Sequence, residues 1–268
     1  MNTNSRHAYI TNIFKIALFM EFFGHGSFGI LKKQGWLPFY HVFGLPDDFA
    51  FLTMPVVGIH DILLAFLVLV RPTPVAFLWM GFWGFFTASL RPMAGQGVLE
   101  FFERSYNYGI PLLAFYMSLQ TAFPVYANWF KKSKFDIDKK YVVLVLRGIA
   151  FSALISHALL ILFFKTEKIM AYSNMQALGE NFKVIGIVEI ACAIGVLFLR
   201  NRPILWSILI FKALLEASPI IGGQLAGWIE FIERGSCYFA IFLLIDYLKY
   251  EKKEARSVFG AVGAGYVS

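Results

Sequence analysis

The chain has 268 residues, of which 58% are hydrophobic, 18% aromatic and only 15% charged, and its mean hydropathy is +0.64. Because about a quarter of the residues of a soluble domain are charged, this balance excludes an ordinary soluble protein and favours a polytopic membrane protein. The formal net charge of +7 is not accompanied by a basic face with interleaved aromatics outside the apolar segments, so no nucleic-acid partner is expected.

The first half of the chain contains four apolar segments, each long enough to cross a bilayer as a helix of about 20 residues. The first covers residues 8–31 and, because it lacks a small-residue cleavage site, is expected to be retained. The amphipathic segment 34–45 that follows carries Trp36, Phe39 and Tyr40, which suit the membrane interface. The other three spans are expected at 49–70, 72–90 and 105–126, with Arg71-Pro72 and Arg91-Pro92 closing the second and third.

The second half of the chain repeats this plan after a lysine-rich linker. Its spans are expected at 141–164, 182–199, 203–216 and 235–248. The expected fold class is therefore all-α, a polytopic membrane protein with about eight transmembrane helices arranged as two parallel four-helix repeats. The predicted boundaries are 1–127 for the first repeat, 128–140 for the linker, 141–250 for the second repeat and 251–268 for a cytoplasmic tail.

Features matched at a distance of about 130 residues indicate an internal duplication. The sequence Glu100-Phe101-Phe102-Glu103-Arg104 returns as Glu230-Phe231-Ile232-Glu233-Arg234, and a Gly-Gln pair precedes each copy. We call these two sequences the acidic–arginine segments. The other matched features are Lys15 with Arg147, His25 with His157, Asp61 with Glu189, Arg71-Pro72 with Arg202-Pro203, and Gly95-Gln96 with Gly223-Gln224.

The orientation of the chain in the membrane follows from the number of spans and from the basic residues. Four spans in each half bring both halves into the bilayer in the same direction. Basic residues favour a cytoplasmic location for both termini and for the linker, because positive charge marks the cytoplasmic side. We therefore expect an integral protein of a bacterial inner membrane, with the lipid bilayer as its surroundings.

Ionisable residues inside the spans should be paired or should line a cavity, because each costs at least about 2.5–3.5 kcal/mol to insert. With a rise of 1.5 Å per residue, His25 lies about 25 Å from the cytoplasmic end of its helix, and Asp61 lies near the midplane. Arg91 or Arg104 is the expected partner of Asp61, because His60 points away from it by about 100°. The candidate ligand-binding residues are expected to converge on a pocket that faces the non-cytoplasmic side. They are His25, Asp61, Arg91, Glu100, Glu103 and Arg104, with a twin set of His157, Glu189, Glu230, Glu233 and Arg234 accompanied by Glu216.

Structural explanations compete with a binding site at each of these positions. The acidic–arginine segments could be interfacial ion pairs that only fix a loop. Lys212 and Glu216 have the spacing of a salt bridge within one helix. His25 lies between two glycines, as a helix-packing residue would, and the aromatic run 82–86 suits lipid contact and packing.

The sequence contains few features that are typical of a cofactor or metal site. Cys192 and Cys237 stand alone in apolar segments, so neither a dithiol redox site nor a cysteine zinc site is expected. The acids lack the Glu-x-x-His spacing of bundle metal sites, so no metal ligands are predicted. A b-type haem ligated by His25 and His157 is a low-ranked alternative. No catalytic residue is assigned.

Five short motifs carry a resemblance to a known family. They are Gly44-Leu45-Pro46-Asp47, the sequence Val-Gly-Ile-His-Asp-Ile-Leu at 57–63, Arg71-Pro72, Leu90-Arg91-Pro92, and the sequence Glu-Arg-Ser-Tyr-Asn-Tyr-Gly-Ile-Pro at 103–111. With these motifs the chain resembles the DoxX-like membrane proteins. Those are four-helix units, and this chain looks like two of them fused, so the resemblance covers nearly its whole length.

In this resemblance, Asp61 and Glu189 match the acid usually found in the second helix of the unit. The second half departs from the pattern, because Arg91-Pro92 becomes Ser218-Pro219 and the Asn-Tyr-Gly-x-Pro run becomes Cys237-Tyr238-Phe239. A site that needs the arginine would therefore be kept only in the first half. The resemblance implies an association with quinone-linked redox chemistry, after the family members tied to thiosulfate oxidation.

Three classes of function are compatible with these features. The first is a redox-associated membrane subunit with an outer-leaflet pocket for a quinone or a similar amphipathic molecule. In it Arg91 and Arg104 would hold a carbonyl or an anion, and His25 would exchange protons. The second is a non-catalytic partner or assembly subunit of a redox or other membrane complex. The third is a proton-coupled small-molecule transporter, which repeats and midplane carboxylates also fit.

Overall fold

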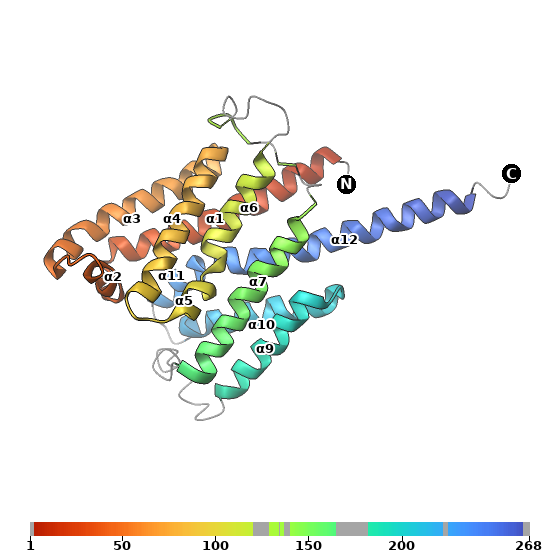
Figure 1. The fold of residues 1–268 in the computed structure, drawn as a ribbon. Coiled ribbons are helices and arrows are strands. Elements are labelled where there is room, and N and C mark those ends of the chain that lie inside the picture. Colours follow the sequence, from red (N-terminus) through yellow and green to blue (C-terminus); the bar gives the residue numbers. More distant parts are fainter. Residues whose placement is uncertain are drawn as a thin grey trace.

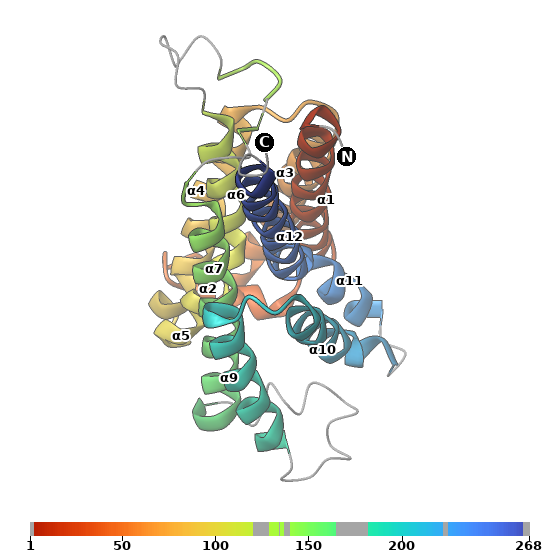
Figure 2. The same ribbon diagram turned by 90° about the vertical axis from the view of Figure 1, so that its right-hand side faces the viewer.

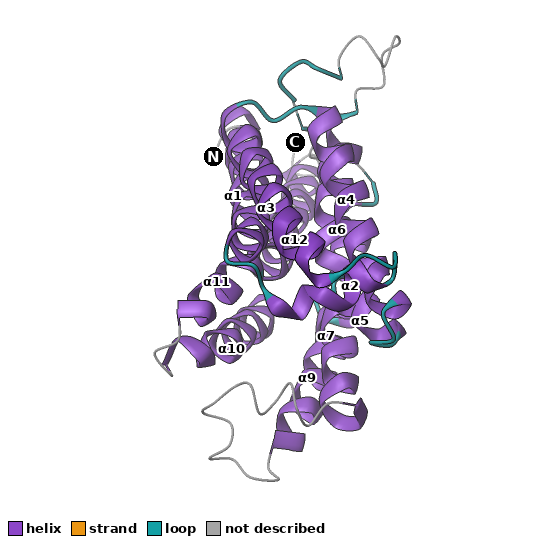
Figure 3. Cartoon of the chain, turned by 90° about the vertical axis from the view of Figure 1, so that its left-hand side faces the viewer, coloured by secondary structure: helices purple, strands orange, loops and turns teal. Residues whose placement is uncertain are grey.

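The computed structural model describes residues 3–119, 129–133, 135–136, 140–164, 182–221 and 225–264. Throughout these ranges the secondary structure is helical, and no strand occurs in them (Figure 3). The predicted all-α class is thereby confirmed. Much of the linker, including Lys134 and Lys139, and the second Gly-Gln pair lie outside the described residues.

The helices of the first half match the expected segments closely. They are α1 (Thr3–Ile30), the 3-10 turn η1 (Gln34–Trp36), α2 (Leu37–His41), α3 (Asp47–Val70), α4 (Pro74–Met93), α5 (Val98–Glu103) and α6 (Ser105–Ser118). Local chemistry sets several of these ends. Thr73 caps α4 by accepting the Ala76 backbone N–H at 3.3 Å, and Pro74 occupies the first turn, where its missing N–H costs nothing.

The second half contains α7 (Val142–Leu159), which continues into a π-helical turn, η3 (Leu160–Phe164), then α9 (Phe182–Phe198), α10 (Arg202–Ile221), α11 (Leu225–Glu233) and α12 (Gly235–Ala264). Three predicted ends were wrong. The helix α4 continues through Arg91-Pro92 to Met93, and α10 continues past Glu216. The helix α12 continues to Ala264, past the end predicted for its apolar span at residue 248. A proline near a helix end removes one backbone hydrogen bond, and α4 tolerates that loss in its last turn.

The four helices α1, α6, α7 and α12 form the centre of the molecule and pack against one another (Figures 1 and 2). Their inner faces supply most of the apolar core, for example Phe14, Tyr106, Leu146 and Leu244, which are all fully or almost fully buried. The other long helices pack on this centre, with α3 against α1, α4 against α6, α9 against α7 and α10 against α12.

The contacts between the two halves are reciprocal. The helix α5, which carries the first acidic–arginine segment, packs on α7 of the second half, and α11, which carries the other, packs on α1 of the first half. Each half therefore places a short charged helix against the first long helix of the other half. This arrangement brings the two acidic–arginine segments to the junction of the halves.

Among the residues that the structure describes, three helical stretches are long and apolar enough to cross a membrane, namely Ser5–Ile30, Asp47–Val70 and Val142–Phe163. On α3 an unbroken apolar stripe recurs at spacings of three and four residues, so it follows one face of the helix. The members of the stripe are all about half exposed or more, and they are Leu52, Val56, Ile59, Leu63, Phe66 and Val70. Such a continuous apolar surface is rare on a soluble monomer and is what a helix presents to lipid tails.

The helices α1 and α3 approach each other at backbone contact distance. An ideal Cβ atom built on Gly58 would lie 2.5 Å from the carbonyl oxygen of Gly26 and 2.7 Å from the backbone nitrogen of Ile30. Only glycine allows two helices to come this close, a device frequent between membrane helices. The close approach fixes the distance between His25 on α1 and Asp61 on α3.

Candidate functional site

The acidic–arginine segments lie in two short helices, each of which is followed directly by an arginine. Arg104 occupies the break between α5 and α6, and Arg234 occupies the corresponding break between α11 and α12. Gly97, with φ +91°, precedes α5 in a left-handed conformation that suits glycine. Glu100 and Glu103 are almost completely buried and Arg104 is 6% exposed, so these charges need partners inside the protein.

Glu103 and Tyr106 link the two arginines at the junction of the halves. Arg234 Nη1 lies 2.8 Å from Glu103 Oε1, and Arg104 Nε lies 3.4 Å from Glu103 Oε2. Both guanidinium groups also donate to the Tyr106 hydroxyl oxygen, at 3.1 Å from Arg234 and 3.2 Å from Arg104. One carboxylate between two cations leaves one positive charge uncompensated, and further carboxylates, Glu233 beside Arg104 and Glu216 beside Arg234, offset it. We call Glu103, Arg104, Tyr106 and Arg234 the junction cluster.

A row of paired charges extends from the junction cluster into the second half. We call its members, Glu216, Lys212, Glu189 and His157, the second-half branch. Arg234 Nε pairs with Glu216 at 3.0 Å, and Glu216 pairs with Lys212 on the same helix at 2.7 Å. The Lys212 ammonium also reaches Glu189 at 3.0 Å, and Glu189 accepts a hydrogen bond from His157 at 2.5 Å. The predicted Lys212–Glu216 salt bridge is confirmed. His157 and Glu189 therefore face a buried lysine.

Asp61, which is matched with Glu189 in the sequence, has different partners from Glu189. The Asp61 carboxylate contacts His25 Nδ1 at 2.6 Å and His60 Nδ1 at 2.9 Å. The prediction that an arginine pairs with Asp61 was wrong, because His25 and His60 each contact one of the two carboxylate oxygens. The Trp79 indole donates to His60 Nε2 at 2.9 Å, so His60 Nδ1 carries the proton that it donates to Asp61.

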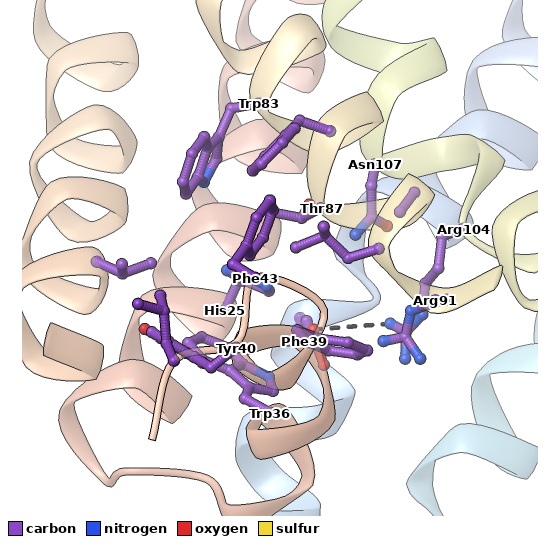
Figure 4. Close-up of a pocket in the computed structure, with 16 residues that line it drawn as sticks. His25, Trp36, Phe39, Tyr40, Phe43, Trp83, Thr87, Arg91, Arg104 and Asn107 are labelled. Atoms are coloured by element: carbon purple, nitrogen blue, oxygen red, sulfur yellow. Dashed lines mark ion pairs between the residues drawn. The ribbon is translucent and has the colours of Figure 1, made fainter. Parts of the chain in front are cut away.

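A cavity of about 230 Å³ opens beside His25 (Figure 4). Its polar wall combines residues of both halves, and its remaining wall is mostly aromatic. The polar side chains are His25, Thr87, Arg91, Arg104, Asn107 and Glu233, and the aromatic ones are Trp36, Phe39, Tyr40, Phe43, Trp83 and Phe86. Binding sites for small molecules typically have this composition, with apolar walls and few convergent polar groups.

Arg91 is held at the cavity by groups on the loop and the short helix that follow α4. Its Nη1 lies 3.3 Å from Gln96 Oε1 and 3.1 Å from Glu100 Oε2. Its guanidinium carbon lies 5.5 Å from the centre of the Phe39 ring, within the range of a cation–π contact. Glu100, predicted to bind a ligand, thus stands behind Arg91 and orients it.

Glu233 supplies a negative charge to the cavity wall. Arg104 Nη1 lies 3.6 Å from its carboxylate, and this ion pair is the dashed line in Figure 4. Burial raises the pKa of Glu233, but the nearby cations, led by Arg104 and Lys33, outweigh burial and bring the pKa down to about 2. The carboxylate is therefore ionised at neutral pH and keeps Arg104 in place.

The predicted residues thus have three locations. His25, Arg91, Arg104 and Glu233 line the cavity, while Asp61 and Glu100 lie directly behind cavity residues. Glu103, Arg234, Glu189 and His157 belong to the junction cluster and the second-half branch. Glu230 lies apart from both, partly exposed, and pairs with Lys33 at 3.3 Å.

Several residues that line the cavity were not among the predicted site residues. The segment 34–45, expected only at the interface, covers the cavity, and Trp36 stacks on His25 with ring centres 4.7 Å apart. Trp83 and Phe86 belong to the aromatic run expected to face lipid, yet Phe82 and Phe85 of that run are the ones about half exposed. The aromatic run was visible in the sequence, whereas the side of α4 that faces inward was not.

The surroundings of the two matched histidines do not fit a haem held between them. His25 lines the cavity, whereas His157 is buried against Glu189 with Lys212 Nζ 3.4 Å from its Nδ1. A haem iron ligated from both sides needs both imidazoles to face it. Within the described ranges, no group of three or more His, Cys, Asp and Glu side chains is arranged to hold a metal ion.

Comparison with known proteins gives no relative from which a function could be transferred. No protein-family model, no curated protein and no solved structure matches this chain.

Proposed function

We propose that this chain is a DoxX-like multi-pass membrane protein that binds a quinone or a similar amphipathic small molecule in the outer leaflet of the bacterial inner membrane. In this proposal it is a redox-associated membrane subunit with both termini in the cytoplasm. The observation that supports the proposal most directly is the cavity beside His25, in which aromatic rings face two arginines and a histidine. The apolar stripe on α3 supports the membrane location.

The cavity lining fits the two chemical parts of a quinone. Planar aromatic side chains such as Trp36, Phe39 and Trp83 can pack against a flat ring. Arg91 and Arg104 are donors only, so they suit a carbonyl oxygen of the ring. The opening of such a pocket toward the apolar part of a bilayer would admit a hydrophobic tail. The proposed quinone binding depends most on Arg91, because Glu100 orients its guanidinium group without blocking the cavity.

Replacing Arg91 by alanine should weaken the binding of a short-chain ubiquinone at least about tenfold, because a hydrogen bond to a charged donor is lost. Quenching of tryptophan fluorescence is a suitable measurement, since Trp36 and Trp83 line the cavity. Arg71→Ala is the matched control, because Arg71 is exposed and donates to the carbonyl oxygen of Phe130 at 3.3 Å. Equal losses in both variants, or no saturable quenching of the wild type, would contradict the proposal.

We expect one quinone per chain although the sequence contains two copies of the plan. In the second-half branch, the Lys212 side chain is fully buried among Glu189, Glu216 and His157. Because these side chains are paired with one another, they are not available to bind a ligand. Titration calorimetry in detergent should therefore give a stoichiometry near one, and a stoichiometry near two would require the second-half branch to open.

A non-catalytic assembly subunit is the second candidate, and the junction cluster favours it. Glu103 with its two arginines joins the halves through paired charges, as a purely structural network would. Purification under mild conditions distinguishes the two candidates. A chain that binds no quinone but elutes in a larger complex, with the Arg91→Ala variant assembling equally well, would favour the assembly role.

A further inference from the structure

The cavity has an inner extension of about 10 Å³, which we call the inner chamber. It shares His25, Trp83, Thr87 and Asn107 with the main cavity, so the two spaces adjoin. Its remaining lining residues are Glu21, Phe22 and Gly84. Glu21 is 2% exposed and was not considered among the candidate residues, although it is an acid in the middle of α1.

Three lining residues of the inner chamber each carry a buried polar atom without a hydrogen-bond partner. These atoms are Glu21 Oε2, Trp83 Nε1 and Asn107 Oδ1. The Ser236 hydroxyl donates to the carbonyl oxygen of Ala17 at 3.3 Å and is a hydrogen-bonding neighbour of one Glu21 carboxyl oxygen, whereas Glu21 Oε2 has no partner. Buried polar atoms almost always have a partner, so three atoms without one, on residues that line the same small space, indicate that this space holds a bound molecule.

The hydrogen-bonding capacity of the three atoms indicates which molecule is bound. The Trp83 indole is a donor, and the Asn107 oxygen accepts. Glu21 Oε2 also accepts, even in a neutral carboxyl group, because the Ser236 oxygen can accept a proton on the other carboxyl oxygen while its own hydroxyl donates to the carbonyl oxygen of Ala17. A water molecule accepts one bond from the indole and donates its two protons to the two oxygens. The volume of the chamber matches that of one water, which needs about 10–15 Å³ and two to four polar partners.

We propose that the inner chamber binds one water molecule that extends the ligand site and selects for a hydroxyl-bearing ligand. With both protons donated and one lone pair occupied by Trp83, the water has a single lone pair left. It can therefore only accept from a ligand in the main cavity. A quinol hydroxyl satisfies it and a quinone carbonyl does not, so the reduced ligand is preferred. This inference rests on the proposed function.

The first test compares a short-chain hydroquinone, kept reduced, with its dimethyl ether, which has the same ring but no donor. The hydroquinone should bind the wild type about three- to tenfold more tightly, the effect of one neutral hydrogen bond. In Glu21→Leu, which removes the acceptor that orients the water, the hydroquinone and the ether should bind with similar affinities. In Glu21→Gln, which keeps an acceptor oxygen, the preference should survive.

The second test does not involve a ligand. A structure of the ligand-free protein that resolves waters should show one within about 3.2 Å of Trp83 Nε1, Glu21 Oε2 and Asn107 Oδ1. An empty inner chamber would overturn the inference even if quinones bind. Equal binding of hydroquinone and ether by the wild type would overturn the selectivity and leave the proposed function standing. If neither probe binds, the proposed function and the selectivity fail together.

Discussion

Replacing Arg234 by alanine should lower the free energy of unfolding by about 3–5 kcal/mol, because it leaves two buried carboxylates without their shared cation. Arg234 contacts Glu103 of the first half at 2.8 Å and Glu216 of the second half at 3.0 Å. Both acids are at most 2% exposed, so neither can recover the loss by hydration. The junction cluster would lose its link to the second-half branch.

The measurement for Arg234→Ala is unfolding in mixed detergent micelles, followed by circular dichroism of the purified protein. Arg71→Ala serves as the control for losing an arginine side chain, and it should change the free energy of unfolding by less than about 0.5 kcal/mol. Lys33→Ala is a poorer control, since Lys33 pairs with Glu230 and lies over the Phe28 ring. Similar destabilisation by Arg234→Ala and Arg71→Ala would show that the buried network carries little of the stability.

Replacing Gly24 by alanine should destabilise the protein by about 2–3 kcal/mol or more, through overpacking between the halves. An ideal Cβ on Gly24 would lie 2.4 Å from the backbone nitrogen and 2.6 Å from the Cα of Glu233. Those atoms belong to the backbone of α11, so no flexible side chain can move aside. The helix would have to shift, and Glu233 would move away from Arg104 at the cavity.

Gly148→Ala is the matched control for Gly24→Ala. It lies within α7, and nothing stands within 4 Å of an added Cβ. Alanine there should stabilise the protein by about 0.5–1 kcal/mol, since glycine is a poor helix residue. Quinone titration of both variants adds a second reading, because only Gly24→Ala displaces a cavity residue. Unchanged stability of Gly24→Ala would mean that α1 and α11 are not in contact.

The lining of the cavity was partly visible in the sequence and partly not. His25, Arg91, Arg104 and Glu233 could be named because charge is expensive among apolar residues, so each charged side chain there stands out. Trp36 could not be named, because an aromatic residue in an amphipathic segment is equally suited to lipid, to the interface or to a binding site. Its position over His25 depends on how the segment 34–45 folds back.

The helical segments, the apolar character and the two acidic–arginine segments could be predicted from the amino-acid sequence, because they depend on composition and on local periodicity. The tertiary structure alone decided which charges meet. Asp61 pairs with two histidines and no arginine, and Glu233 of the second half completes a cavity of the first. Pairing of this kind depends on side-chain rotamers and on the distance between helices far apart in the sequence, neither of which leaves a mark in local periodicity.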